Sequence, residues 1–212
     1  MRWIVSFLVV CSLVGCENPG AKVESATVEE PSEPAAAATP EATDKAAVGP
    51  QLPITPENSK IEFVGAKVTK SHEGGFTKFA GTVDVREPIE ASIIQIEIET
   101  ASLYSDAPKL TKHLKSADFF DVETYPSASF TSKQITKTET GHTITGDLTL
   151  HGQTKTITFP ATIAQGADGG VTGDAEFAID RHDFGITYPG MPDDLIRDKV
   201  VIRLKLNIPP QT

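Results

Sequence analysis

Much of the chain after residue 60 alternates apolar with polar residues. Ile94, Ile96 and Ile98 are separated by polar residues, and the same alternation runs through 198–208. A period of two residues predicts strands that bury one face, because successive side chains of a strand point to opposite sides. Eight such runs are found, at 60–69, 76–85, 92–99, 127–136, 142–150, 154–164, 171–180 and 198–208.

Turn-forming residues separate most of these runs, for example Gly74-Gly75, Gly141 and the stretch 168–170. Short gaps of this kind favour antiparallel neighbours. The predicted fold class is therefore all-β, with eight antiparallel strands closed into a barrel or packed as a sandwich. An eight-stranded barrel is just wide enough to be filled by side chains or to hold one small ligand.

One segment, 106–115, breaks the two-residue alternation. Asp106 is a good N-cap residue, and Leu110 and Leu114 are four residues apart, so they would share one face of a helix. We predict a short helical insertion here, followed by a turn that directs the next two phenylalanines inward. Such an insertion would plug or roof one end of a barrel.

The N-terminal end has the pattern of an export signal. Arg2 precedes an apolar run of twelve residues, Trp3 to Val14. A membrane-spanning helix needs about 20 residues, so the run is too short to cross a bilayer and reads as a signal peptide. The run 13–16, Leu-Val-Gly-Cys, resembles the bacterial lipobox. We therefore expect a lipoprotein signal peptide at 1–15 and a lipidated Cys16; an ordinary signal peptide is the alternative.

These features imply a lipoprotein of the cell envelope that faces the periplasm or the exterior, with the membrane as a partner through its lipid anchor. The following segment, 16–52, is rich in Ala, Pro and acidic residues and contains no aromatic residue. Such a composition cannot bury enough apolar surface to offset the entropy of ordering, so we predict a disordered tether. As a flexible coil it would reach roughly 30–35 Å. The folded domain is expected at 53–212.

Charge and reactive residues narrow the classes of function. The net charge of -10 argues against a nucleic-acid partner, which requires a basic surface. Both cysteines, Cys11 and Cys16, precede the domain, so the domain has no Cys-based zinc site. His72-Glu73 begins like a His-Glu-x-x-His zinc motif, but Phe76 stands at the second His position. We find no catalytic constellation and predict neither an enzyme nor a metal site.

Three segments resemble the YceI-like family. They are 112–122, followed at a short distance by Tyr125-Pro126 and Phe130, then 146–155 and 181–186, in this order along the chain. The resemblance implies an exported bacterial protein with a lipocalin-like barrel, and it implies a polyisoprenoid or another long-chain amphiphile as ligand. One departure concerns the first strand, where many family members carry a His and this chain has 64–68 without one.

The ligand site must then lie on the apolar inner face. The alternative is that the aromatic side chains on this face simply fill the core. The protein would then be a ligand-free envelope scaffold or interaction protein. Arg181 is either a structural residue or a contact for a ligand head group. No cofactor is expected besides a bound isoprenoid or lipid, and a homodimer is compatible with the sequence. The candidate ligand-binding residues are Phe79, Phe119, Phe120, Phe130, Leu148, Phe177, Phe184 and Arg181.

Overall fold

A computed structural model describes residues 18–31 and 49–210. The long strands are β3 (Ser59–Ala66), β4 (Ser71–Phe76), β5 (Phe79–Asp84), β6 (Ile93–Glu99), β8 (Ser127–Lys137), β9 (His142–Leu150), β10 (Gln153–Gln165), β11 (Val171–Asp180) and β14 (Lys199–Ile208). The short elements are the 3-10 turns η1 (Pro19–Ala21), η2 (Ile89–Ala91), η3 (Thr100–Ser102) and η4 (Arg181–Phe184), the helix α1 (Pro108–Leu114), and the strands β1 (Thr27–Glu29), β2 (Gln51–Ile54), β7 (Leu103–Ser105), β12 (Gly190–Met191) and β13 (Asp194–Leu195).

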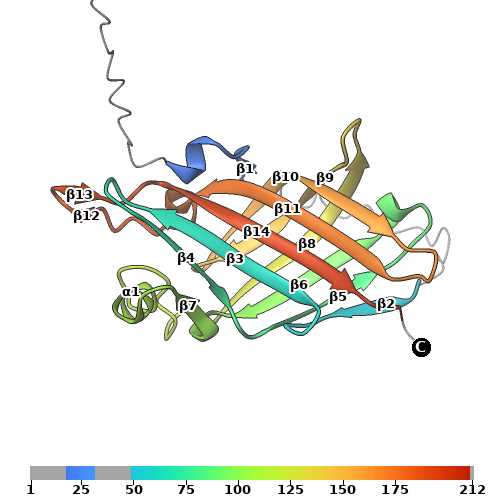
Figure 1. Ribbon diagram of the computed structural model, residues 1–212, viewed down its shortest axis with the longest axis horizontal. Helices are drawn as coiled ribbons and strands as arrows, with labels where there is room; N and C mark the ends of the chain where they lie inside the picture. The colour runs from blue at the N-terminus through green and yellow to red at the C-terminus, as the bar shows by residue number, and fades with distance from the viewer. Residues whose placement is uncertain (1–17, 32–48, 211–212) are drawn as a thin grey trace, which may run out of the picture.

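One antiparallel sheet makes up the body of the molecule (Figure 1). Its strands are hydrogen-bonded in the order β2-β5-β6-β8-β9-β10-β11-β14-β3-β4-β7. β4 and β5 lie near opposite ends of this order, yet only Thr77 and Lys78 separate them in the chain. The sheet must therefore curl until its two ends meet. This confirms the all-β, antiparallel, lipocalin-like class, and each of the eight predicted runs overlaps one long strand.

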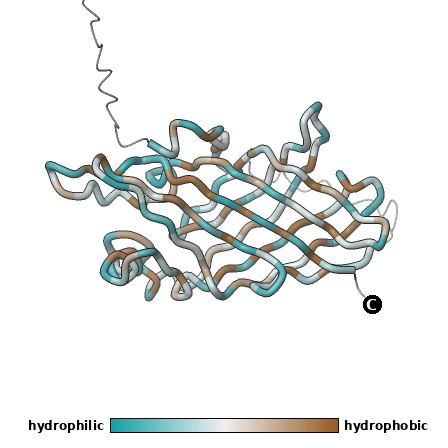
Figure 2. The backbone as a smooth tube through the Cα atoms, viewed as in Figure 1, coloured by the Kyte–Doolittle hydropathy of each residue, from teal (hydrophilic) through white to brown (hydrophobic). Residues whose placement is uncertain are grey.

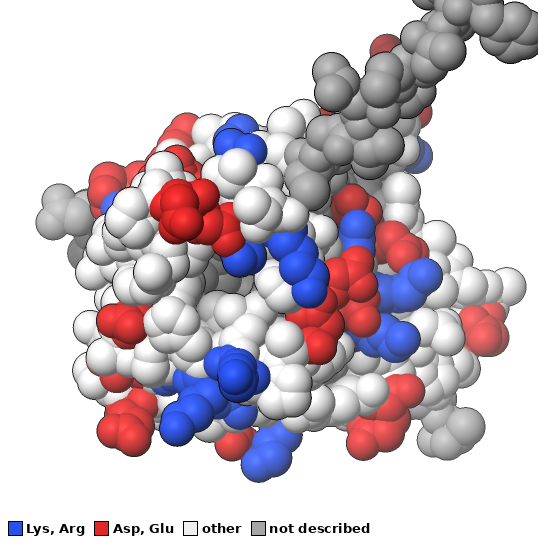
Figure 3. All heavy atoms as spheres, turned by 60° about the vertical axis from the view of Figure 1, so that its left-hand side comes forward, with Lys and Arg blue, Asp and Glu red and all other residues white. Residues whose placement is uncertain are grey.

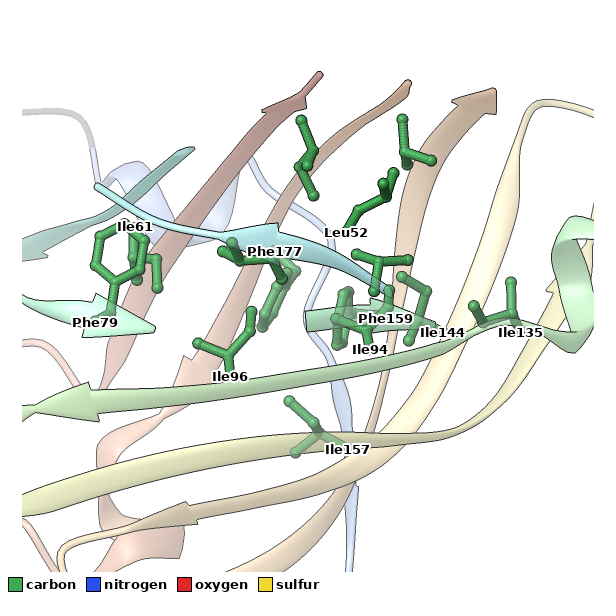
Figure 4. Packing of buried hydrophobic residues seen from close by; sticks show 14 of the residues in the cluster. Leu52, Ile61, Phe79, Ile94, Ile96, Ile135, Ile144, Ile157, Phe159 and Phe177 are labelled. Atoms are coloured by element: carbon green, nitrogen blue, oxygen red, sulfur yellow. The ribbon is translucent and has the colours of Figure 1, made fainter. Parts of the chain in front are cut away.

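The two-residue alternation places one row of apolar side chains inside the curled sheet. Figure 2 shows the alternation as successive apolar and polar segments along the strands. Phe177 on β11, Ile202 on β14 and Phe63 on β3 are direct cross-strand partners and belong to one inward row. Figure 4 shows such side chains converging from opposite strands, with Phe159 and Phe177 close together. Burial of this row is the main favourable term in folding.

The predicted count of eight strands was too low, because β4 and the short strands β1, β2, β7, β12 and β13 were not predicted. The long strand β4 was missed because its glycines resemble a turn. Gly74 and Gly75 lie within β4, which pairs with β3 on one side and with β7 on the other. A Cβ atom at Gly74 would lie 2.3 Å from the backbone oxygen of Tyr104. These glycines therefore permit a close approach of neighbouring backbones, which is a known role of glycine inside a strand.

The helical insertion is present, but its N-cap differs from the prediction. The N-cap residue of α1 is Ala107, and its side chain makes no capping bond. Asp106 instead holds His72, with 2.7 Å between the carboxylate Oδ1 and the ring Nδ1. The residue that would have capped the helix thus fixes the position of α1 against β4.

The predicted disorder is wrong for the two parts of the expected tether that the structure describes, 18–31 and 49–52. In the N-terminal part, β1 pairs with β10, and the Ala26 N–H donates to the Ala178 carbonyl on β11 over 2.8 Å. Residues 162–165 of β10 pair with residues 171–174 of β11, and beyond these residues the two strands separate. The segment 24–30 lies in the gap and forms hydrogen bonds with both strands. Near the other end of the expected tether, β2 pairs with β5 and extends the sheet. The expected signal peptide, Cys16 and residues 32–48 lie outside the described residues.

Candidate functional site

A cavity of about 400 Å³ occupies one half of the barrel interior. Pockets that bind small molecules usually measure about 300–1,000 Å³. The inner face of the sheet forms its wall, α1 and the following loop form a roof, and the hairpin of β12 and β13 borders its opening. Apolar residues on strands make up most of the wall: Ile61, Phe63, Ile96, Ile98, Ala128, Phe130, Leu148, Leu150, Ile157, Phe159, Phe177, Ile179, Val200, Ile202 and Leu204.

Three rings in contact close the inner end of this cavity. Phe159 stacks on Phe177 with 4.1 Å between ring centroids, and Phe130 contacts Phe159 at 5.7 Å. Beyond this aromatic floor lies a second, mostly apolar cavity of only about 50 Å³. Phe130 and Phe159 line both cavities. The barrel is therefore hollow toward α1 and nearly filled toward the opposite end, with the rings as the partition.

Gly65 on β3 enlarges the hollow half. It lines the cavity, and a Cβ atom placed on it would meet no atom within 4 Å. Its inward-facing neighbours along the strand, Phe63 and Lys67, also line the cavity. The missing side chain at this position therefore leaves open space in the wall rather than permitting a close backbone contact.

The ion-pairing side chains that line the cavity all have a partner within the protein: Lys67, His72, His113, Arg181 and Asp194. Lys67 forms an ion pair with Asp194 on β13. The hydrogen bond from Lys67 lowers the pKa of the Asp194 carboxyl, which therefore stays ionised at neutral pH. His72 is held by Asp106, as described above. An apolar interior with a few polar groups at its opening suits an amphiphile, whose chain and head group need different surroundings.

Three rings pack beneath α1 and form part of the roof. The centroid of His113 on α1 lies 4.9 Å from that of Phe119 and 5.1 Å from that of Tyr188. The Nε2 atom of His113 lies 2.9 Å from Asp118 Oδ2. Leu114 and Phe120 complete the apolar underside of the roof. The helical insertion therefore covers this part of the cavity with its own side chains.

Arg181 borders the cavity but uses its guanidinium for internal contacts. It is only 5% exposed and donates to the carbonyls of Ile186 over 2.7 Å and of Arg197 over 3.2 Å. Its ion partner is Asp198, at 3.5 Å. Burial lowers the pKa of Arg181, against the opposing effect of nearby acids. These contacts support the structural role that the sequence left open.

The cavity brings together most of the predicted ligand-binding residues. Phe119, Phe120, Phe130, Leu148, Phe177 and Arg181 all line it. Phe79 and Phe184 instead pack within the buried core cluster, outside the cavity wall. Alternation alone identifies the inner face of a strand, but it does not tell which end of that face is hollow.

Several cavity residues were not predicted. Gly65 gave no signal because a glycine has no side chain that would mark an inward position within the run 60–69. Met191 gave none because the hairpin 190–195 lacks an extended alternating run. Tyr188 lies in an irregular segment that follows η4. Phe159 had an available signal, since it belongs to the alternating run 154–164.

Residues 18–31 and 49–210 contain no group of three or more His, Cys, Asp or Glu side chains placed to hold a metal ion. In the same residues, every helix is too short or too polar to cross a bilayer.

Comparison with known proteins places the fold. The family model of the YceI-like domain matches residues 53–208. A UPF0312 protein of Pseudomonas putida strain W619 is 45% identical over 125 residues, which are 55% of this chain and 65% of the relative. The match thus spans slightly less than two thirds of the relative's length.

Two solved structures extend the comparison. The crystal structure of BcnA from Burkholderia cenocepacia has a TM-score of 0.66 at 28% identity, covering 72% of this chain and 98% of that protein. A polyisoprenoid binding domain from Saccharophagus degradans, implicated in plant cell wall breakdown, has a TM-score of 0.61 at 15% identity, covering 76% of this chain and 98% of that domain. The second likeness establishes the fold alone.

Proposed function

Because the chain belongs to the YceI-like family, we propose that it is a binding protein that holds the apolar chain of one amphiphile, a polyisoprenoid or a long-chain lipid, inside the hollow half of its barrel. The observation that carries this proposal is the cavity of about 400 Å³ with an apolar wall and a polar opening. A ligand-free envelope scaffold would have no need of this hollow, which a few larger side chains would fill.

The geometry favours binding over catalysis. A catalytic acid, base or nucleophile needs a free polar atom directed at the reacting group. At this opening Lys67 is paired with Asp194, His72 with Asp106, and Arg181 with backbone carbonyls and Asp198. These groups are suited to surround a polar head group while the strands hold the chain.

We further propose that Cys16 carries a lipid anchor and that the protein works at a membrane of the cell envelope. The lipobox-like run 13–16 and the apolar run before it support this step. Binding, transport and storage of an amphiphile at a membrane would all use the same cavity.

Mass spectrometry tests the ligand proposal directly. The chain would be exported with a cleavable signal, carry Cys16→Ser so that no detergent is needed, and be measured under native and denaturing conditions. We expect a stoichiometric extra mass that is lost on denaturation, or uptake of an added prenyl alcohol or prenyl quinone. Protein that stays free of ligand after addition of these compounds would overturn the proposal and favour the scaffold.

A further inference from the structure

Large apolar side chains protrude at the opening of the cavity. Within the described residues, four large hydrophobic side chains are exposed, and three of them lie on two adjacent loops. Val68, between β3 and β4, is 44% exposed; Met191 on β12 is 62% exposed; and Leu195 on β13 is 50% exposed. Exposed apolar groups that gather at one place indicate an interaction site, whereas scattered ones carry no such meaning.

The two loops form one fixed tip. The Val68 N–H donates to the Leu195 carbonyl over 3.0 Å, and Lys67 pairs with Ile196 as an isolated antiparallel bridge. The ion pair between Lys67 and Asp194 joins the same loops. We call Val68, Met191 and Leu195 the apolar tip. The protein thus holds these side chains in water by a defined set of contacts.

The apolar tip continues the surface of the cavity. Met191 is exposed to solvent and also lines the cavity. A long-chain ligand that leaves the barrel along this route would meet water at the tip, and each exposed methylene group would cost free energy. A bilayer in contact with the tip would remove that cost, because the chain would pass from one apolar environment into another.

The N-terminal segment leads to the same end of the barrel. η1 packs on the first residue of β14, since a Cβ atom at Gly20 would lie 2.8 Å from the Cβ of Lys199. Val200, the next residue of β14, lines the cavity. Cys16 is two residues before Asn18, the N-cap of η1, so an anchor on Cys16 would be held within about 7 Å of Asn18. A free tether of 36 residues would have allowed the barrel any orientation relative to the membrane. This short connection instead keeps the cavity end of the barrel near the anchor.

We propose that the cavity opening docks on a lipid bilayer, with the apolar tip inserted at the membrane surface. The inference rests on the proposed function, because it supplies the route by which the amphiphile would exchange with the membrane. Figure 3 turns the end that bears β12, β13 and α1 toward the viewer, and acidic and basic side chains are mixed on this face. With a net charge of -10, the contact is apolar rather than an attraction between basic residues and anionic lipid.

Quenching by brominated lipid tests this docking. A single Trp would be placed by Met191→Trp or Leu195→Trp in the full chain carrying Trp3→Phe, and the protein would be bound to phosphatidylcholine vesicles with and without brominated acyl chains. The matched control is Ala167→Trp, at an exposed position in the turn between β10 and β11 at the opposite end of the barrel. We expect quenching at 191 and 195, none at 167, and no loss in about 1 M salt, where charges are screened within about 3 Å.

The same preparations separate this inference from the proposed function. Equal quenching at both ends, or none at 191 and 195, would overturn the docking even where prenyl alcohol uptake is intact. Quenching at the tip without any ligand uptake would instead overturn the proposed function and leave the docking in place. A second variant, Val68→Ser with Leu195→Ser, should slow ligand transfer from vesicles and leave uptake of ligand added in solution unchanged; an unchanged transfer rate would also contradict the docking.

Discussion

Filling the hollow at Gly65 should block the ligand without harming the fold. Gly65 lines the cavity on β3, and a Cβ atom there would meet nothing within 4 Å. In Gly65→Phe the ring would therefore project into open space and occupy part of the cavity of about 400 Å³. A phenylalanine placed in a packed core would instead force its neighbours apart.

The expected stability change follows from two terms of the same sign. A glycine inside a strand costs roughly 0.5–1 kcal/mol relative to alanine. Burying a phenylalanine side chain contributes roughly 1.5–3 kcal/mol when it fits. Because part of the ring remains within reach of solvent in the hollow, we expect a gain of about 1–2 kcal/mol in the free energy of unfolding.

Urea unfolding and native mass spectrometry together check this result. Gly65→Ala is the size control and should keep ligand uptake, because a methyl group leaves most of the cavity empty. Gly81→Phe is the packing control and should be strongly destabilised, since a Cβ there would lie 2.2 Å from the Gln95 oxygen. The reasoning would be refuted if Gly65→Phe were destabilised like the Gly81 variant, or if it took up ligand as well as the unchanged protein does.

Three further predictions concern the partition, the opening and the N-terminal segment. Phe159→Ala should cost about 3–5 kcal/mol in urea unfolding and shift uptake toward longer prenyl alcohols, because it joins the two cavities; an unchanged length preference would count against the aromatic floor. Asp194→Asn should raise the rate of amide hydrogen exchange in 190–196, because it removes the ion pair with Lys67. In the unchanged protein the protection of these amides should persist as the pH falls to 3.8, the ordinary pKa of the carboxyl, and should be lost only below it, because Lys67 lowers the pKa of Asp194. Val28→Asp should cost about 1–3 kcal/mol, because Val28 packs against the core, and should remove exchange protection from 24–30; retained protection would contradict the pairing of this segment with β10 and β11.

The sequence was sufficient to predict most of the long strands and the family, because both depend on local patterns. Period-two alternation identified eight long strands, and three short motifs carried the family resemblance. β4 was not predicted because Gly74 and Gly75 permit a close backbone contact with β3 and β7, and no local sequence pattern indicates such a contact. The ordering of 24–30 was not predicted for a similar reason. Its hydrogen bonds depend on a gap between β10 and β11, which are far from this segment in the sequence.

The cavity wall was predicted only in part. Phe79 and Phe177 both belong to alternating runs, but only Phe177 lines the cavity, although the cross-strand partner of Phe79, Ile98, lines it as well. The difference depends on how the sheet curls and on where the three floor rings meet, which are properties of the whole fold. Lys67 and Asp194 are 127 residues apart, so their pairing at the opening could not be read from spacing.

The most direct measurement of the central claim is photo-crosslinking with a prenyl alcohol that carries a diazirine on its chain, followed by peptide mapping. We predict labelling of inward residues in the hollow half, such as Leu148, Leu150 and Ile202, competed by unlabelled prenyl alcohol and lost in Gly65→Phe. Labelling confined to outward-facing residues, or labelling that persists unchanged in Gly65→Phe, would contradict the account.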